Sequence, residues 1–141
     1  MYEEIEAAVA RSGTEAGIRL LGRVDAEFRE LLLRGADISL MPNIAVAGDM
    51  EGFGLVAVES ACRGALVLAA ALEGITDAVV DGETGILVEP GYPEPFVETI
   101  RALAADRDRL AALAAEYQQE ALERFSVDRM ARELRAAIGL S

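Results

Sequence analysis

The chain of 141 residues contains no histidine, no lysine and a single cysteine. Without histidine it cannot supply a Ser-His-Asp or Cys-His nucleophile, an imidazole base or a histidine-containing zinc site. Cys62 alone cannot form an intramolecular disulfide or a thiolate metal cluster. The low cysteine content predicts that the protein lies in a reducing compartment, the cytoplasm. Any proton transfer must therefore use carboxylates, tyrosine, the cysteine or groups stabilised by arginine.

Positive charge is also scarce, because 13 arginines stand against 25 Asp and Glu residues and give a net charge of -12. Nucleic acids and anionic membranes are bound mainly by clustered positive charge, so neither is an expected partner. No apolar run approaches the roughly 20 residues that span a bilayer, and the acidic start Met1–Glu4 is unlike a signal peptide. With 52% hydrophobic and 27% charged residues, we expect one globular domain over residues 1–141.

Apolar spacing predicts an alternation of helices and short strands. The strands are expected at residues 18–22, 37–41, 65–70 and 86–88. The helices are expected at residues 3–11, 26–35 and 53–63, followed by three more that begin near Pro95, Asp106 and Ser126. Strand 65–70 is apolar on both faces, as in a parallel sheet covered by helices on both sides. The sequence therefore predicts a layered α/β fold with a mainly parallel sheet.

The most informative segment runs from Met41 to Gly85, and its centre is Glu51-Gly-Phe-Gly-Leu followed by Glu59. Gly52 and Gly54 allow the backbone to approach a ligand closely, and a helix that begins near Phe53 offers free N–H groups to an anion such as a diphosphate. Glu51 precedes this helix and Glu59 lies about two turns into it. Their carboxylates can therefore accept hydrogen bonds from different hydroxyl groups of one extended ligand.

This segment resembles the donor-binding motif of the retaining glycosyltransferases of group 1, which have the GT-B architecture of two Rossmann-like domains. Further matches follow the family's order along nearly the whole chain. They are Gly22-Arg23-Val24, Ala36-Asp37, Met41-Pro42, Glu59-Ser-Ala, Gly74-Ile-Thr-Asp, the run from Asp81 to Pro90, and Arg124-Phe-Ser. The resemblance is to the C-terminal, donor-binding domain, and it implies a Rossmann-like parallel sheet with flanking helices.

The resemblance also implies a site and a reaction. The implied donor- and nucleotide-binding residues are Glu51, Gly52, Phe53, Gly54, Leu55, Glu59, Val24 and Arg23. Glu51 would face the donor sugar as the catalytic residue, and Glu59 would bind the ribose hydroxyls. Backbone N–H groups of residues 53–55 would bind the phosphates, and Val24 would lie near the base. The family transfers a sugar from a UDP- or GDP-type donor to an acceptor hydroxyl with retention, and it uses no metal or other cofactor.

Three of these residues have a plain structural interpretation as well. Glu51 could act only as an acidic partner of the helix dipole. Glu59 could pair with Arg63 one helical turn later. Arg23 could hold a phosphate or form a surface ion pair with a neighbouring acid such as Asp25. The residues alone leave these alternatives open.

Relative to the family, the fold is expected to be incomplete. Family members begin this domain with two further strands in a sheet of order 3-2-1-4-5-6, and an acceptor domain precedes it. Residues 18–22 would then be separated from 37–41 by two vacant positions, and unpaired strand edges are costly. Movement of strand 18–22 beside 37–41, a docked N-terminal fragment or a second copy of the chain would close this gap. We expect a homo-oligomer, a two-fold dimer, because that symmetry is the commonest. The chain alone is expected to be inactive, and a non-catalytic oligomeric interaction module is the alternative function.

Overall fold

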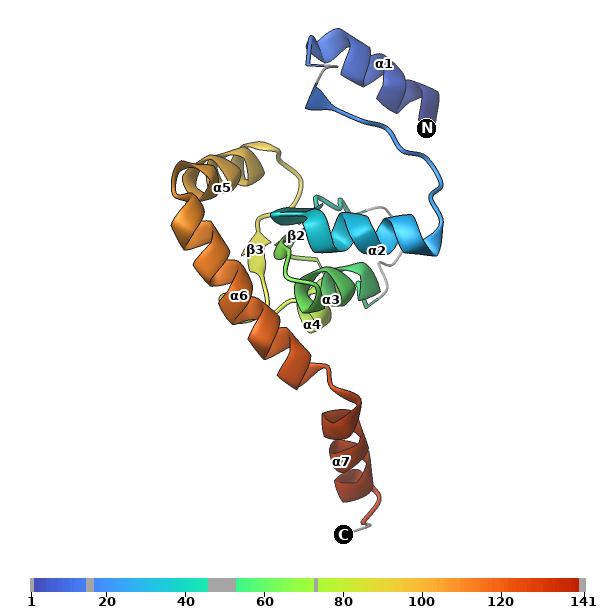
Figure 1. Cartoon of the computed structure of the whole chain (residues 1–141), viewed down its shortest axis with the longest axis vertical. Coiled ribbons are helices and arrows are strands. Elements are labelled where there is room, and N and C mark those ends of the chain that lie inside the picture. The colour runs from blue at the N-terminus through green and yellow to red at the C-terminus, as the bar shows by residue number, and fades with distance from the viewer. Residues whose placement is uncertain (1, 15–16, 46–52, 73, 140–141) are drawn as a thin grey trace. The chain divides into compact units, whose positions relative to one another are not determined.

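The computed structural model describes residues 2–14, 17–45, 53–72 and 74–139, and its contacts divide the chain into two units, Met1–Glu30 and Leu31–Ser141 (Figure 1). Helix α2 (Ala26–Gly35) crosses the boundary between them. The first unit also contains α1 (Tyr2–Ser12). The α2 range is the one predicted from the apolar spacing of the sequence.

The prediction of a strand at residues 18–22 is wrong. The described residues 17–25 contain no strand, and Ile18, Leu20 and Leu21 are 42%, 37% and 46% exposed. Gly22 adopts a left-handed conformation with φ of 61° and ends the extended run. An apolar run becomes a strand only when a neighbouring strand pairs with it, and none in the described part of the chain does so.

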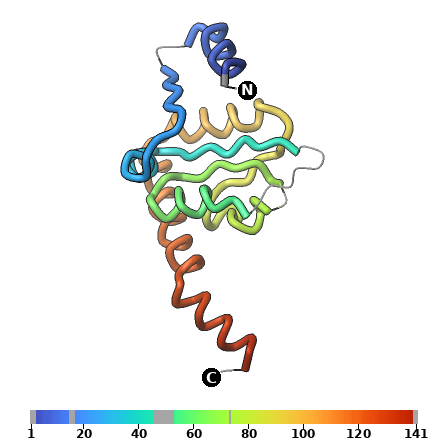
Figure 2. Tube along the Cα trace, turned by 90° about the vertical axis from the view of Figure 1, so that its right-hand side faces the viewer, coloured from blue at the N-terminus to red at the C-terminus, as the bar shows by residue number. Residues whose placement is uncertain are grey.

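The second unit carries a parallel sheet of order β1-β2-β3 with helices on both faces. Its elements are β1 (Ile38–Met41), α3 (Leu55–Cys62), β2 (Leu66–Ala70), α4 (Ile75–Ala78), β3 (Ile86–Val88), α5 (Glu94–Ala105), α6 (Arg107–Arg124) and α7 (Val127–Ala137). The register places Ile38 beside Leu66 and Leu68 beside Ile86. Figure 2 shows the three strands side by side. The predicted parallel α/β architecture is confirmed.

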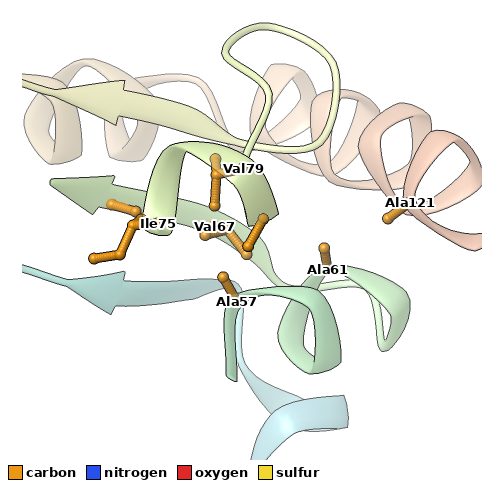
Figure 3. Packing of buried hydrophobic residues seen from close by; sticks show 8 residues of the cluster. Ala57, Ala61, Val67, Ile75, Val79 and Ala121 are labelled. Carbon is orange, nitrogen blue, oxygen red and sulfur yellow. The ribbon is translucent and has the colours of Figure 1, made fainter. Parts of the chain in front are cut away.

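Strand β2 is the centre of the core, because every one of its residues is buried. Side chains alternate along a strand, so odd-numbered and even-numbered residues point to opposite faces of the sheet. Val67 and Ala69 pack with α3, α4 and Ala121 of α6 (Figure 3). Leu66 and Leu68 pack on the other face, against side chains of α5 and α6. Burial of one such leucine contributes about 1.5–3 kcal/mol to stability.

Helix ends follow the signals in the sequence. Asp106 and Ser126 cap α6 and α7, since their side chains accept hydrogen bonds from the backbone N–H groups of Arg109 and Arg129 over 2.9 and 3.2 Å. Gly64 follows α3 with a φ of 93°, a conformation that favours glycine. Helix α4 was not predicted, because four residues are too few to show a helical period.

Helix α7 and the residue that follows it carry apolar side chains at helical spacing, but α7 buries none of its residues. Met130, Leu134 and Ile138 are 64%, 60% and 61% exposed. The corresponding stripe of α5 does reach the core, where Phe96 and Leu103 are buried. The helical period alone cannot distinguish these two outcomes. No helix among the described residues is long and apolar enough to cross a membrane.

Candidate binding site at the start of helix α3

The start of α3 has the backbone geometry of an anion site. Gly54 occupies the N-cap position in the left-handed conformation, with φ of 69° and ψ of 41°, and no side chain caps the helix there. The first intrahelical hydrogen bond runs from the N–H of Ala57 to the carbonyl of Gly54 over 2.8 Å. The N–H groups of Leu55 and Val56 precede that bond, so they can donate to a ligand.

The chain connectivity places this helix start at the carboxyl edge of the sheet. Helix α3 ends at Cys62, and β2 begins at Leu66 on the amino edge, so α3 begins near the opposite edge. Ligands of open α/β sheets bind outside the carboxyl ends of the strands. The helix start is therefore where this fold class binds small molecules.

Serine hydroxyls and small apolar side chains fix α3 against the sheet. Ser60 is fully buried, and its hydroxyl donates to the carbonyl of Val56 over 2.7 Å. The hydroxyl of Ser39 on β1 donates to the hydroxyl of Ser60 over 2.9 Å. Ala57 and Ala61, on the same side of the helix, are 1% and 3% exposed. The free N–H groups at the start of the helix are thus held on a rigid element.

Glu59 lies one helical turn after Leu55 and is half-buried. The Arg63 guanidinium donates through Nη1 to the backbone carbonyl of Glu59 over 2.9 Å. Glu51 and Gly52 lie outside the described residues, so the predicted pairing of Glu51 with Glu59 across one ligand stays a prediction. Arg23 and Val24 belong to the first unit, and their predicted roles stay predictions too.

A cavity of about 520 Å³ opens at the amino edge, where Asp37 and Arg107 form an exposed ion pair of 3.1 Å. A second cavity, of about 500 Å³, touches the start of α3 directly. Its apolar lining consists of Phe53, Leu55, Val58, Phe125 and Met130, and its polar lining consists of Asp77, Arg124, Ser126, Arg129 and Glu133. The rings of Phe53 and Phe125 meet edge to face, with centroids 6.2 Å apart. We call this second space the α3–α7 cavity.

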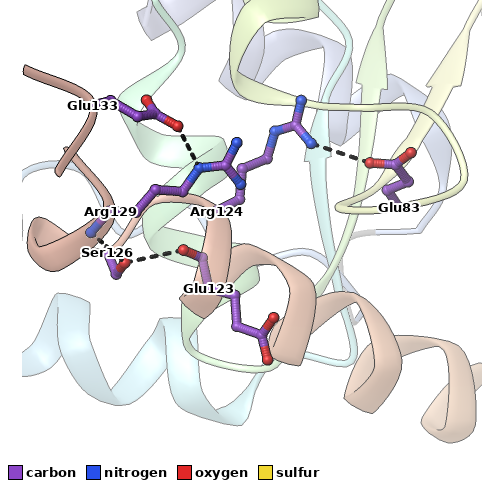
Figure 4. A network of polar contacts seen from close by, with 6 residues as sticks. All are labelled: Glu83, Glu123, Arg124, Ser126, Arg129 and Glu133. Atoms are coloured by element: carbon purple, nitrogen blue, oxygen red, sulfur yellow. Dashed lines mark hydrogen bonds and ion pairs between the residues drawn. The ribbon is translucent and has the colours of Figure 1, made fainter. Parts of the chain in front are cut away.

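Both arginines of the α3–α7 cavity are engaged with carboxylates (Figure 4). Arg124 Nη1 lies 3.1 Å from Glu83 Oε2, and Arg129 Nε lies 2.7 Å from Glu133 Oε1. The hydrogen bond to Glu133 raises the pKa of Arg129 above its already high ordinary value. Both guanidinium groups are therefore charged, and an anionic ligand would have to compete with their carboxylate partners.

Residues 81–85 form a turn between α4 and β3. Asp81 Oδ1 accepts a hydrogen bond from the N–H of Leu87 over 2.9 Å, and the buried Thr84 hydroxyl accepts one from the N–H of Val80 over 2.9 Å. Gly82 has a φ of 75°. A Cβ on Gly85 would lie 2.7 Å from Val79 Cγ1, so no larger residue fits there without movement. Glu83, which forms the ion pair with Arg124, lies in this turn.

Sequence reasoning did not find the part that α7 plays in this cavity. The contact between Phe53 and Phe125 joins residues 72 positions apart in the sequence, and helical periodicity carries no information on such pairs. The only sequence signal for this region was the motif Arg124-Phe-Ser, which is part of the family resemblance but was assigned no function. Among the described residues no group of three His, Cys, Asp or Glu side chains could hold a metal ion.

The parallel sheet and the helices on both of its faces define an open α/β domain of the Rossmann-like class. The family model described as "Glycosyl transferases group 1" matches residues 1–121. The chain belongs to the group 1 glycosyltransferases.

The curated relatives include D-inositol 3-phosphate glycosyltransferases from several bacteria. The one from Geodermatophilus obscurus is 37% identical over 109 residues, which cover 77% of this chain and 23% of that protein. The one from Catenulispora acidiphila is 42% identical over 108 residues, which cover 74% of this chain and 25% of that protein. The chain thus spans about a quarter of the length of these relatives.

Solved structures share the fold. Anabaena HepE, in complex with UDP and glucose, is 26% identical with a TM-score of 0.81, and the match covers 98% of this chain and 36% of HepE. The C-terminal domain of the group 1 transferase LpcC from Francisella tularensis has a TM-score of 0.76 at 24% identity, covering 89% of this chain and 63% of that one. The resemblance to a GT-B C-terminal domain, made from the sequence, is confirmed.

Proposed function

We propose that this chain is the donor-binding part of a retaining glycosyltransferase, which takes a sugar from a UDP- or GDP-type nucleotide sugar and passes it to an acceptor hydroxyl. The observation that carries the proposal is the start of α3, where Gly54 leaves backbone N–H groups without a capping side chain at the carboxyl edge of the sheet. The presence of UDP and glucose in the HepE structure supports a nucleotide-sugar donor.

The proposed roles follow the elements that hold each residue. The N–H groups of Phe53, Gly54 and Leu55 bind the diphosphate, because a helix start offers both free donors and a positive end of the helix dipole. Glu59, one turn into the same helix, accepts hydrogen bonds from the ribose hydroxyls. Glu51 faces the donor sugar as the catalytic residue.

The remaining roles fall on the segment before α3 and on the first unit. Gly52 allows close approach of the backbone to the donor. Val24 lies near the base, and Arg23 contacts a phosphate. We propose that the chain alone does not turn over, since it spans only about a quarter of its curated relatives. The lone Cys62 supports a reducing, cytoplasmic compartment.

Titration calorimetry of the folded chain with UDP, UDP-glucose and GDP tests the donor site. We expect binding in the millimolar range or tighter for wild type and a loss of at least tenfold in Glu59→Gln. The matched control is Glu116→Gln, the same change on an exposed residue of α6. If a folded sample shows no heat of binding at millimolar ligand, the donor-site proposal is wrong.

A second candidate function is a non-catalytic interaction module that keeps the fold. The exposed apolar stripe of α7 favours it, because Met130, Leu134 and Ile138 are available to a partner. Under this alternative, Glu51→Ala and Glu59→Ala leave partner binding and stability nearly unchanged. For either function we propose an assembly, a homodimer or a complex with a complementing N-terminal fragment.

A further inference from the structure

The motif Arg124-Phe-Ser lies at the joint between α6 and α7, and each of its residues contacts a different part of the chain. Arg124 forms its ion pair of 3.1 Å with Glu83, in the turn before β3 (Figure 4). The ring of Phe125 meets the ring of Phe53 edge to face. The hydroxyl of Ser126 accepts a hydrogen bond from a backbone N–H in the first turn of α7. The joint is therefore fixed from three sides.

Phe125 is anchored on the core. It follows the last residue of α6, and its N–H donates to the carbonyl of Ala121 over 3.0 Å. Ala121 is fully buried. Phe125 also packs against the buried cluster to which α3, β2, α4 and α6 contribute. Its position is thus set by contacts that do not involve Phe53.

Phe53 has much less support of its own. It precedes α3, so the first intrahelical hydrogen bond, from Ala57 to Gly54, does not include it. Its side chain is 45% exposed, and no side chain caps the helix at Gly54. Gly54 itself lies against α4, because an added Cβ would be 3.5 Å from Ala78 Cβ. The anchored ring of Phe125 is therefore a fixed support for a residue that the helix does not hold.

We propose that Phe125 is a positioning residue of the donor site. Its ring holds Phe53, so that the N–H groups of Phe53, Gly54 and Leu55 keep the direction in which they meet the diphosphate. Phe125 acts through Phe53 and does not touch the donor. This inference deepens the proposed function and rests on it, because it explains how a site without a capping side chain keeps its backbone donors in place.

The energy of the ring contact limits the size of the effect. A contact can shift a conformational equilibrium by no more than its own free energy. Loss of the contact should therefore weaken UDP binding about twofold to tenfold, which corresponds to about 0.5–1.5 kcal/mol for an aromatic pair. The ion pair of Arg124 is partly exposed, so Arg124→Gln should have a smaller effect than loss of the Phe125 ring.

Titration of the folded chain with UDP tests the proposal. Phe125→Leu and Phe53→Leu each remove one ring of the pair, and a double variant removes both. We expect all three to lose UDP affinity by the same factor, because each breaks the same contact. The matched control is Phe96→Leu, which makes the same change at a buried ring packed on the opposite face of the sheet. It should bind UDP as wild type does.

A second measurement needs no ligand. NMR order parameters report the mobility of individual amides. Those of Phe53, Gly54 and Leu55 should fall in Phe125→Leu and stay at the wild-type value in Phe96→Leu. Circular dichroism shows whether each variant is folded. If Phe125→Leu does not fold, Phe53→Leu gives the same test from the exposed side of the contact.

Four results would overturn the proposal. They are wild-type UDP affinity in Phe125→Leu, an equal loss of affinity in Phe96→Leu, a double variant whose loss is the product of the two single losses, and unchanged order parameters at residues 53–55. The positioning role alone is wrong if wild type binds UDP and Phe125→Leu binds it equally well. If wild type binds no UDP, the proposed function is wrong, and the order parameters alone decide whether Phe125 holds residues 53–55.

Discussion

The hydroxyl of Ser39 on β1 and the hydroxyl of Ser60 on α3 are joined by a hydrogen bond of 2.9 Å. Ser60 in turn donates to the carbonyl of Val56 one helical turn earlier. A side-chain bond thus ties the sheet to the helix whose first N–H groups form the candidate site. The geometry of that site therefore depends on how α3 packs against the sheet as well as on the conformation of Gly54.

Ser60→Ala should destabilise the fold more than Ser39→Ala. The change at Ser60 removes two hydrogen bonds and leaves the Ser39 hydroxyl without its acceptor, which costs about 1–3 kcal/mol. The change at Ser39 leaves Ser60 its bond to Val56 and should cost about 0.5–1.5 kcal/mol. Urea unfolding of both variants gives the two free energies, and the reverse order would contradict the network.

Gly54→Ala should lower both stability and donor affinity. The left-handed conformation costs an L-residue about 1–2 kcal/mol, whereas the nearest atom to an added Cβ is Ala78 Cβ at 3.5 Å, an ordinary contact. The matched control is Gly82→Ala, with φ of 75° and no atom within 4 Å of an added Cβ. Both variants should lose similar stability in urea unfolding, but only Gly54→Ala should weaken UDP binding in calorimetry. Equal UDP affinity in the two variants would contradict the proposed phosphate contact.

Gly85→Ala should destabilise the chain for a different reason. Its φ is not in the left-handed region, but an added Cβ would lie 2.7 Å from Val79 Cγ1 and 3.0 Å from the carbonyl oxygen of Val67. Overpacking of this kind costs about 1–3 kcal/mol. Thermal unfolding should show a lower Tm than wild type, and an unchanged Tm would mean that β2 and residue 85 are not packed as described.

Cys62 should make stability depend on pH on the alkaline side. Burial raises the pKa of the Cys62 thiol, and the nearby Arg63 opposes this only in part. The thiol pKa is higher in the folded state than in the unfolded state. The contribution of the protonated thiol to folding stability is therefore fully present below the ordinary thiol pKa near 9.0, and it is lost as pH rises through the folded pKa. The difference in unfolding free energy between wild type and Cys62→Ala should therefore be constant below that range and change above it, toward lower wild-type stability. A constant difference up to pH 10.5, or about 1.5 units above the ordinary value, would contradict a raised pKa.

The sequence predicted most of the sheet unit, because its signals are local. The all-apolar run at residues 66–70, the caps at Asp106 and Ser126 and the glycine after α3 each act on their own neighbours in the chain. The parallel pairing of β1 with β2 was expected from the alternation of elements, and the structure confirms it.

What the sequence could not predict depends on distant contacts. The apolar residues 18–22 lack a pairing strand in the described chain, and no local pattern shows whether one exists. The α3–α7 cavity requires Phe53 and Phe125 to meet, which spacing cannot foresee. At the site, a helix start that could bind an anion was predicted from Gly52, Gly54 and a helix beginning near Phe53, whereas the positions of Asp77 and α7 in the cavity lining were not predicted.

A titration of isotope-labelled protein with UDP-glucose, followed by amide chemical shifts, tests the donor site most directly. We predict the largest shifts at the amides of Phe53, Gly54 and Leu55 on wild type, with saturation in the millimolar range or below, and much weaker shifts on Glu59→Gln. The absence of shifts at millimolar UDP-glucose, or shifts confined to residues away from the start of α3, would contradict the donor site.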